Sequence, residues 1–210
     1  MHLGMTGWFR VETTAAANQR GRDRDQALEN RHDHVVFSMS SGVTVTFNDP
    51  RRFGMMDLVA GSHLPHHGSL AAIGPEPLSR EFDARALAMG LAKRKISLKV
   101  ALLDQRVVAG IGNIYASEAL HLAHLSPFRR ASTLATKSGA PRPACNGLVT
   151  AIKSVLRRAI SLKQTARYDE SRFRVYDHDG EPCPTPGCGG RILRAWQAGR
   201  STFYCRVCQR

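Results

Sequence analysis

The chain has 210 residues, with 30 Lys or Arg against 17 Asp or Glu, a formal net charge of +13 and a pI near 10.3. This balance favours a polyanionic partner, above all nucleic acid, over a surface that is merely basic and well solvated. A hydrophobic content of 42% is enough to build a core in one or two compact domains. Because no apolar run is long enough to cross a bilayer, we expect no membrane contact.

The first 60 residues have the pattern of short β-strands. The sequence HVVFSMSSGVTVTFND alternates apolar and polar residues on both sides of Ser41-Gly42, which predicts a β-hairpin that ends at Asn48-Asp49-Pro50. The stretch from Glu12 to Arg31 is polar and aperiodic, and we interpret it as a long surface insertion. Residues 1–7, MHLGMTG, begin like the middle of a strand and its turn. We therefore expect the first domain to be incomplete.

Two arginines and a phenylalanine follow the predicted hairpin in DPRRFG, residues 49–54. Arg51, Arg52 and Phe53 suit a DNA contact, because guanidinium groups hold phosphates and an apolar ring can wedge between bases. A strand end with solvated charges is the alternative interpretation. The His- and Pro-rich residues 61–77 are predicted to be a linker between domains, in preference to a metal site at its histidines.

The next part of the chain is predicted to be helical over residues 81–105 and again over 145–162, where apolar residues recur on one face. Between these segments, Gly110 and Gly112 permit a tight turn and Asn113 is a candidate N-cap for the helix that follows. A glycine turn that opens a helix presents free backbone N–H groups, which can bind a phosphate without any side chain. A nucleotide-cofactor fingerprint is excluded, because it needs a further helical glycine and a preceding strand.

Four cysteines near the C-terminus predict a metal site. Cys183 and Cys188 form one knuckle, Cys205 and Cys208 form another, and four thiolates complete the tetrahedral shell of one structural Zn²⁺ ion. Two disulfides of a secreted domain are the disfavoured alternative. Between the knuckles, ILRAW and STFYC alternate about QAGR, which predicts a β-hairpin with Arg200 at its tip. Cys145 is left over and is expected to be a small core residue.

Five motifs carry a resemblance to a known family: HLGMTG, HDHV, DPRRFG, LLDQRVVAGIGNIYASEAL and GRSTFYCRVCQR. In this order, and over nearly the whole chain, they resemble formamidopyrimidine-DNA glycosylase, the bacterial base-excision repair enzyme for oxidised purines. The resemblance implies an α+β fold. Its parts are a truncated β-sandwich domain at residues 1–75, a helix-two-turn-helix DNA-binding domain at 76–165 and a C-terminal zinc-bound β-hairpin, a four-cysteine zinc finger, at 175–210.

The resemblance implies a function as well as a fold. The protein would remove oxidised purines from duplex DNA as a glycosylase with AP lyase activity, through a Schiff base and β,δ-elimination. Its partner would be double-stranded DNA with an oxidised purine or an abasic site, and one structural Zn²⁺ would be its cofactor. It would act as a monomer in the bacterial cytoplasm, at the nucleoid.

The residues that the resemblance places at the DNA are Met5, His32, Arg51, Phe53, Lys95, Lys99, Asn113 and Arg200. Met5, Arg51 and Phe53 would fill the gap left in the duplex by the flipped nucleotide. The side chains of His32 and the two lysines would touch the DNA backbone. Asn113 and Arg200 would grip phosphates beside the lesion, and Arg200 would donate the proton for the last elimination step.

The sequence also departs from the family pattern. The family's nucleophile is the amine of an N-terminal proline, whereas residue 2 is His here, and the glutamate and lysine that accompany the proline have no match. A start codon further upstream or a truncated product would each explain this, so a non-catalytic damaged-DNA-binding protein is the alternative function. The segment 161–177 is shorter than in the family, and the first cysteine pair encloses four residues instead of two.

Overall fold

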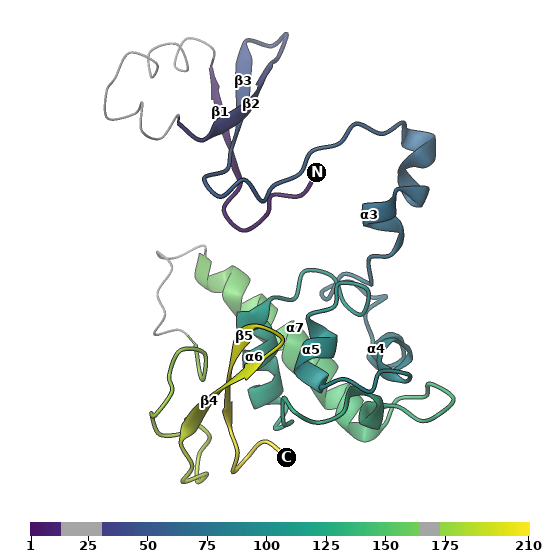
Figure 1. Ribbon diagram of the computed structural model, residues 1–210, viewed down its shortest axis with the longest axis vertical. Coiled ribbons are helices and arrows are strands. Elements are labelled where there is room, and N and C mark those ends of the chain that lie inside the picture. The colour runs from purple at the N-terminus through teal and green to yellow at the C-terminus, as the bar shows by residue number, and fades with distance from the viewer. Residues whose placement is uncertain (14–30, 164–172) are drawn as a thin grey trace. The chain divides into compact units, whose positions relative to one another are not determined.

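The computed structural model describes residues 1–13, 31–163 and 173–210 (Figure 1). The chain divides into two compact units, residues 1–64 and 65–210. The surface insertion predicted after Glu12 and the shortened segment before the zinc finger fall largely on residues 14–30 and 164–172, outside the described residues. No helix in the described part of the chain is long and apolar enough to span a membrane.

The first unit is a three-stranded antiparallel sheet with strand order β1-β3-β2. The strands are β1 Trp8–Thr13, β2 Asp33–Ser38 and β3 Val43–Asn48. The predicted β2–β3 hairpin is confirmed, with Gly42 in the left-handed region at φ 75°. Phe9 and Val35 both lie opposite Phe47, which is the only buried hydrophobic side chain among the described residues of this unit. Its core is therefore small.

The second unit is mainly helical. Its helices are η1 Gly61–His66, which begins in the first unit, α3 Gly68–Ala71, α4 Ala84–Leu91, α5 Leu98–Leu102, α6 Asn113–Leu122, η2 Ala131–Leu134 and α7 Pro143–Lys163. The stretch predicted to be a linker thus forms two short helical segments, η1 and α3. Leu148 and Ile152 lie one helical turn apart on the buried face of α7, which packs against α4 and α6. Helices α4 to α7 enclose one continuous hydrophobic core.

The C-terminal hairpin consists of β4 Ile192–Gln197 and β5 Arg200–Cys205. Gln197 pairs with Arg200, and the two residues of the turn, Ala198 and Gly199, both have positive φ angles of 48° and 73°. Such a turn matches the right-handed twist of the strands it joins. The predicted hairpin is therefore confirmed. Its inner face contributes Ile192, Phe203 and Cys205 to a second, much smaller core that also contains Val175.

Candidate nucleic-acid interface and metal centre

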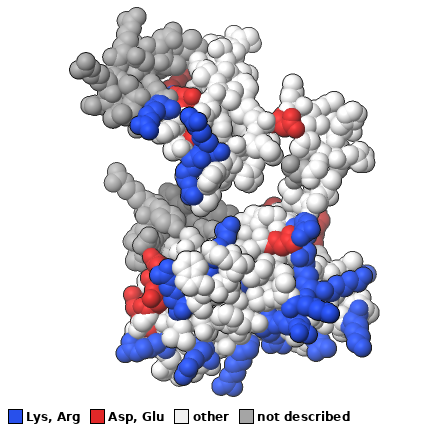
Figure 2. All heavy atoms as spheres, in the orientation of Figure 1, with Lys and Arg blue, Asp and Glu red and all other residues white. Residues whose placement is uncertain are grey.

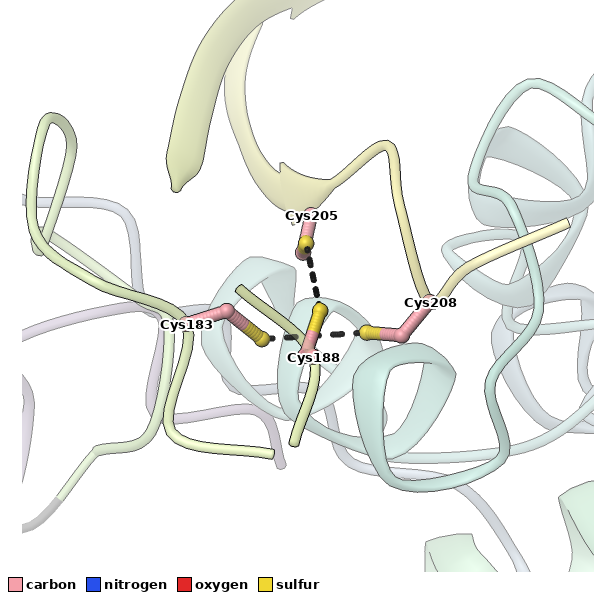
Figure 3. A group of neighbouring side chains, drawn as sticks. All are labelled: Cys183, Cys188, Cys205 and Cys208. Carbon is pink, nitrogen blue, oxygen red and sulfur yellow. Dashed lines mark hydrogen bonds between the residues drawn. The ribbon is translucent and has the colours of Figure 1, made fainter. Parts of the chain in front are cut away.

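The four predicted metal ligands lie together. Cys183 and Cys188 come from the loop before β4, Cys205 ends β5 and Cys208 follows it, and their thiols point toward one another (Figure 3). The Sγ atoms are 3.7 Å apart for Cys183 and Cys208 and 3.6 Å apart for Cys188 and Cys205, and all four lie within 4.8 Å of one another. A Zn–S distance of about 2.3 Å implies sulfur separations of about 3.8 Å in a tetrahedron. The cluster therefore has the chemistry and the spacing to hold one metal ion.

Two polar side chains, His121 and Thr185, lie beside this cluster. His121 of α6 is buried, and its Nε2 atom lies 3.5 Å from the Cys183 Sγ and 3.2 Å from the Thr185 Oγ1. Burial, together with the charges of Arg174 and His124, lowers the pKa of His121 to about 4, which keeps the ring neutral. A neutral ring can still donate one N–H to a thiolate ligand, as groups behind metal ligands commonly do.

Cys145 lies apart from the cluster, at the start of α7. Its side chain is fully buried, and the thiol donates to the carbonyl of Ala84 at 3.3 Å. Burial, with a contribution from the charge of Asp83, raises the pKa of this thiol to about 11. Cys145 is therefore an unreactive core residue, as the sequence predicts.

The structure places the side chain of Lys99 differently from the predicted DNA contact. Its side chain is completely buried instead of exposed to a DNA backbone. The Nζ atom donates to the Asn113 Oδ1 at 2.6 Å, to the Ser201 carbonyl at 2.9 Å and to the Thr202 Oγ1 at 2.8 Å. All three donors of the ammonium group are thus used within the protein. Burial, and then the nearby charge of Arg200, lowers its pKa to about 8. Lys99 joins α5, the start of α6 and the hairpin tip.

Asn113 is also placed differently from the prediction of an N-cap. The residue that caps α6 is Gly112, and Asn113 is the first helical residue. Its side chain does not cap the helix, because the Oδ1 atom accepts from Lys99 while the Nδ2 atom donates to the Ser201 carbonyl at 2.9 Å. These bonds fix the glycine turn against β5. Asn113 and Arg200 are consequently held next to each other.

The turn that precedes α6 depends on two residues that the sequence analysis missed, Asp104 and Gln105. The Asp104 carboxylate accepts from Arg94 at 2.6 Å and from Arg106 at 2.8 Å, and these bonds, Arg106 first, hold its pKa well below the usual range. The Gln105 Oε1 accepts from the Gly110 backbone N–H at 2.6 Å. The only sequence signal for these roles is their position just before the glycines.

Glu118 is a third residue that the sequence analysis missed. This buried carboxylate of α6 accepts backbone N–H groups from three successive residues, Arg174 at 2.8 Å, Val175 at 2.9 Å and Tyr176 at 3.0 Å. Tyr176 in turn packs edge-on against Phe203 of β5, with ring centroids 4.9 Å apart. Glu118 therefore anchors the zinc-finger region to the same helix that carries Asn113.

Arg200 and Lys95 are exposed, as their predicted contacts with DNA require. Among the residues that the structure describes, neither side chain takes part in an ion pair. Figure 2 shows many Lys and Arg side chains and fewer acidic ones on the visible face of residues 65–210. Positive charge is therefore available to a polyanion on this unit.

In the first unit, the structure brings Met5, Arg51 and Phe53 together. The Arg51 guanidinium lies 4.7 Å from the Phe53 ring centroid, and its NH1 group is 3.4 Å from the Met5 Sδ. Met5 is 71% and Phe53 is 56% exposed, which is unusual for such apolar side chains and suits insertion into a stacked duplex. His32 is half-buried, and its carbonyl accepts from the Asp49 backbone N–H at 2.9 Å.

Asp49 shapes the turn that carries these residues. Its buried carboxylate accepts from the Thr6 hydroxyl at 2.7 Å and from the Gly54 backbone N–H at 2.6 Å. The bond from Thr6, followed by the backbone bonds, lowers the pKa of Asp49. These contacts tie the chain start to the turn, which includes Arg52 at a positive φ of 56°.

We expect Asp49→Asn to loosen this turn, because an amide offers one acceptor oxygen where the carboxylate offers two. The variant should unfold its first unit at a lower denaturant concentration than the wild type at pH 7. Since the pKa of Asp49 is lowered by folding, its contribution is present above the unfolded pKa of about 3.9 and is lost as pH falls through the folded value. Denaturation of both proteins between pH 2 and 7 should show that this gap, the difference between their denaturant midpoints, becomes smaller in acid. A gap that is independent of pH would contradict the role of the carboxylate.

Comparison with known proteins places this geometry in a family. Residues 1–56 match the model of the formamidopyrimidine-DNA glycosylase N-terminal domain, and residues 73–171 match the H2TH domain of the same enzyme. A formamidopyrimidine-DNA glycosylase of Azorhizobium caulinodans is 52% identical over 100% of this chain and 76% of its own length. The chain belongs to the formamidopyrimidine-DNA glycosylase family. The suspected resemblance is thereby confirmed.

Solved structures of the family agree with this assignment. The Lactococcus lactis formamidopyrimidine-DNA glycosylase, bound non-covalently to DNA containing an AP site, is 31% identical with a TM-score of 0.77. This match covers 100% of the present chain and 72% of that one. The Thermus thermophilus protein is 36% identical with a TM-score of 0.73, over 99% of this chain and 73% of that chain. The α+β fold class of the family, with its helical DNA-binding domain, is therefore confirmed.

Proposed function

We propose that the protein is a DNA-repair enzyme that removes oxidised purines from duplex DNA, as a glycosylase with AP lyase activity. The observation that carries this function is the family relationship, which extends over the whole chain at a sequence identity of 50% to 52% with two relatives. It favours the enzyme over the non-catalytic damaged-DNA-binding alternative. The substrate would be double-stranded DNA with an oxidised purine or an abasic site, and the enzyme would act as a monomer in the bacterial cytoplasm.

Two sets of side chains support this function. In the first unit, Met5, Arg51 and Phe53 would enter the duplex and occupy the space left by the flipped nucleotide. His32 would approach the DNA backbone beside them. In the second unit, Lys95 would also contact the backbone. These roles require exposed side chains for insertion and for phosphate contact, and the exposure of Met5, Phe53 and Lys95 agrees with that requirement.

Asn113 and Arg200 would bind the phosphates beside the lesion. Lys99 is buried between them, so it would position both residues instead of touching DNA itself. Arg200 would also donate the proton of the last elimination step. Each of these groups acts by holding an anion or a proton at a defined place, which is how preorganised sites stabilise a transition state.

The metal of the four-cysteine cluster would be Zn²⁺. Cys183, Cys188, Cys205 and Cys208 would hold it with no coordination position left for water or substrate, so the ion would stabilise structure and take no part in the reaction. The spacing of the sulfur atoms supports this assignment. The zinc would fix the base of the β4–β5 hairpin, and hence the place of Arg200 at its tip.

Borohydride trapping tests the enzymatic function. A full-length form that carries the family's N-terminal proline is incubated with a duplex that contains oxidised guanine, because residue 2 is His here and the Schiff base needs an amine. Borohydride reduces that Schiff base to a stable adduct. We expect a covalent adduct and a cleaved strand. Saturable binding to the damaged duplex without an adduct would support the non-catalytic alternative, and the absence of both would overturn both functions.

Arg200→Ala provides a matched test of the phosphate contact. We expect it to weaken duplex binding and to reduce the slope of log affinity against log salt by about one, as loss of one phosphate contact does. In an active protein, it should also leave the β-elimination product uncleaved at the second step. The control is Arg80→Ala, which removes an exposed charge from the loop before α4. An equal effect of the two substitutions would contradict a specific role for Arg200.

A further inference from the structure

An aromatic and cationic pair with no role in the site described above lies near the tip of the zinc-finger hairpin, on the strand face that carries Phe203. Trp196 of β4 is 69% exposed, which makes it one of the most exposed large hydrophobic side chains of the protein. The Arg194 guanidinium carbon lies 5.6 Å from the Trp196 ring centroid and also 5.6 Å from the centroid of Phe203. Arg194 is thus held between an exposed ring and a buried one.

The orientation of Arg194 is fixed while its charge remains available. Its Nε atom donates to the Ser201 Oγ at 3.1 Å, and its guanidinium carbon lies over both rings at cation–π distance. Within residues 1–13, 31–163 and 173–210, Arg194 forms no ion pair. A guanidinium group that is held in place by neutral partners keeps its affinity for an anion and loses little rotamer entropy on binding one.

The strand register places this pair beside Arg200. Trp196 lies opposite Ser201, and Gln197 lies opposite Arg200. Directly paired residues have Cα atoms about 4.5 to 5.5 Å apart. Trp196 is the chain neighbour of Gln197, the residue paired with Arg200, so the two side chains leave the backbone close to each other. Successive residues point to opposite faces of a strand, and therefore Arg200 and the Arg194–Trp196 pair lie on opposite faces of the hairpin tip.

The two faces have different surroundings. On the face of Arg200, Thr202 and Gln197 are bonded to Lys99 and Ser97, which turn that face toward the helices. On the other face, Phe203 and Tyr176 close the small core and the Arg194–Trp196 pair extends outward from it. The pair is therefore exposed beside the tip that carries Arg200.

We propose that Arg194 and Trp196 form a second DNA contact, which binds the sugar–phosphate backbone of the duplex held by Arg200. The Arg194 guanidinium binds a phosphate group of the backbone. The Trp196 indole packs on the adjoining sugar and can donate its N–H to a phosphate oxygen. The positive charge of the protein favours this occupant over an apolar partner. The inference rests on the proposed function, because it requires that the hairpin tip binds DNA.

Tryptophan fluorescence tests the contact directly. The protein has two tryptophans, so Trp8→Phe leaves Trp196 as the only one in the otherwise complete, zinc-loaded chain. Titration with a duplex that contains an abasic site should change the Trp196 emission, with the same midpoint as binding measured by anisotropy of labelled DNA. An emission spectrum that stays unchanged while the DNA binds would overturn the inference.

Substitutions give the second measurement. We expect Trp196→Ala to weaken binding about tenfold, on the scale of other aromatic contacts with nucleic acid, and Arg194→Ala to lower the salt slope by about one. Arg206→Ala is the matched control, because Arg206 is exposed in the second knuckle at the far end of the hairpin. Zinc content is measured for every variant. The contact would be overturned if the two variants lost DNA affinity only in proportion to their loss of zinc. It would also be overturned if Arg206→Ala lost as much affinity as they do.

The outcomes separate this inference from the proposed function. If the wild type does not bind the duplex, the proposed function fails. If Arg200→Ala weakens binding while Trp196→Ala and Arg194→Ala do not, only the second contact fails. Self-association of the wild type without DNA, abolished by Trp196→Ala, would assign the pair to a second copy of the chain and would also overturn the inference.

Discussion

Removal of zinc is expected to unfold the β4–β5 hairpin and to abolish duplex binding, while helices α4 to α7 stay folded. Among the described residues, the core that the hairpin shares with Val175 contains only four buried residues, whereas the helical core is continuous and contains none of the four clustered cysteines. A structural zinc site contributes an apparent binding free energy of about 10 to 16 kcal/mol, more than such a small core can replace. Circular dichroism and DNA binding, measured before and after chelation, would show this difference.

The matched variants for this prediction are Cys208→Ser and Cys145→Ser. The first removes a metal ligand, and we expect less than one zinc ion per chain together with loss of DNA binding. The second removes a buried thiol that lies outside the cluster, so zinc content and DNA binding should both persist. Full DNA binding by metal-free protein would contradict the role of the cluster in presenting Arg200.

Lys99→Met is expected to destabilise the second unit by about 2 to 4 kcal/mol, because it leaves buried acceptors without their donor. The methionine side chain fills much of the same volume but cannot bond to Asn113, Ser201 or Thr202. The hairpin tip would lose its connection to α6, so DNA affinity should fall although Lys99 itself is buried. Chemical denaturation and duplex binding would measure the two effects.

Lys95→Met is the matched control, since Lys95 is exposed and four residues away. It should change stability by less than about 0.5 kcal/mol and lower the salt slope by about one. Lys99→Met should leave the salt slope nearly unchanged, because no exposed charge is lost. A lowered slope with unaltered stability in Lys99→Met would show that Lys99 contacts DNA directly.

The effect of the buried Lys99 on the free energy of unfolding depends on pH in a defined direction. Its folded pKa is lowered to about 8, below the unfolded value of about 10.4. Between these values the unfolded chain binds more protons, so the stability of the wild type relative to Lys99→Met should rise as pH increases from 8 to 10. The same denaturation measurements, repeated across this range, would detect the trend.

Local patterns predicted both hairpins and the metal cluster. The alternation around Ser41-Gly42 and around QAGR identifies the strands because side chains alternate with a period of two, and the turn residues identify where the chain reverses. The cysteine spacing identifies the ligands because a knuckle brings near neighbours in sequence together. Each of these features is local, and local sequence is sufficient to specify it.

The sequence by itself thus determined both hairpins, the helices α6 and α7, the four-cysteine cluster, the positive charge and, through its ordered motifs, the family. Only the tertiary structure decided that Lys99 is buried, that Asn113 bonds to the hairpin instead of capping its helix, and that Glu118 anchors the zinc-finger region. Most of these bonds join residues that are 56 to 103 positions apart. The bond between Lys99 and Asn113 spans 14 positions, and it depends on which partner the Asn113 side chain takes. A period or a motif records neighbours along the chain, whereas burial and the choice of hydrogen-bond partner depend on which distant segments pack together.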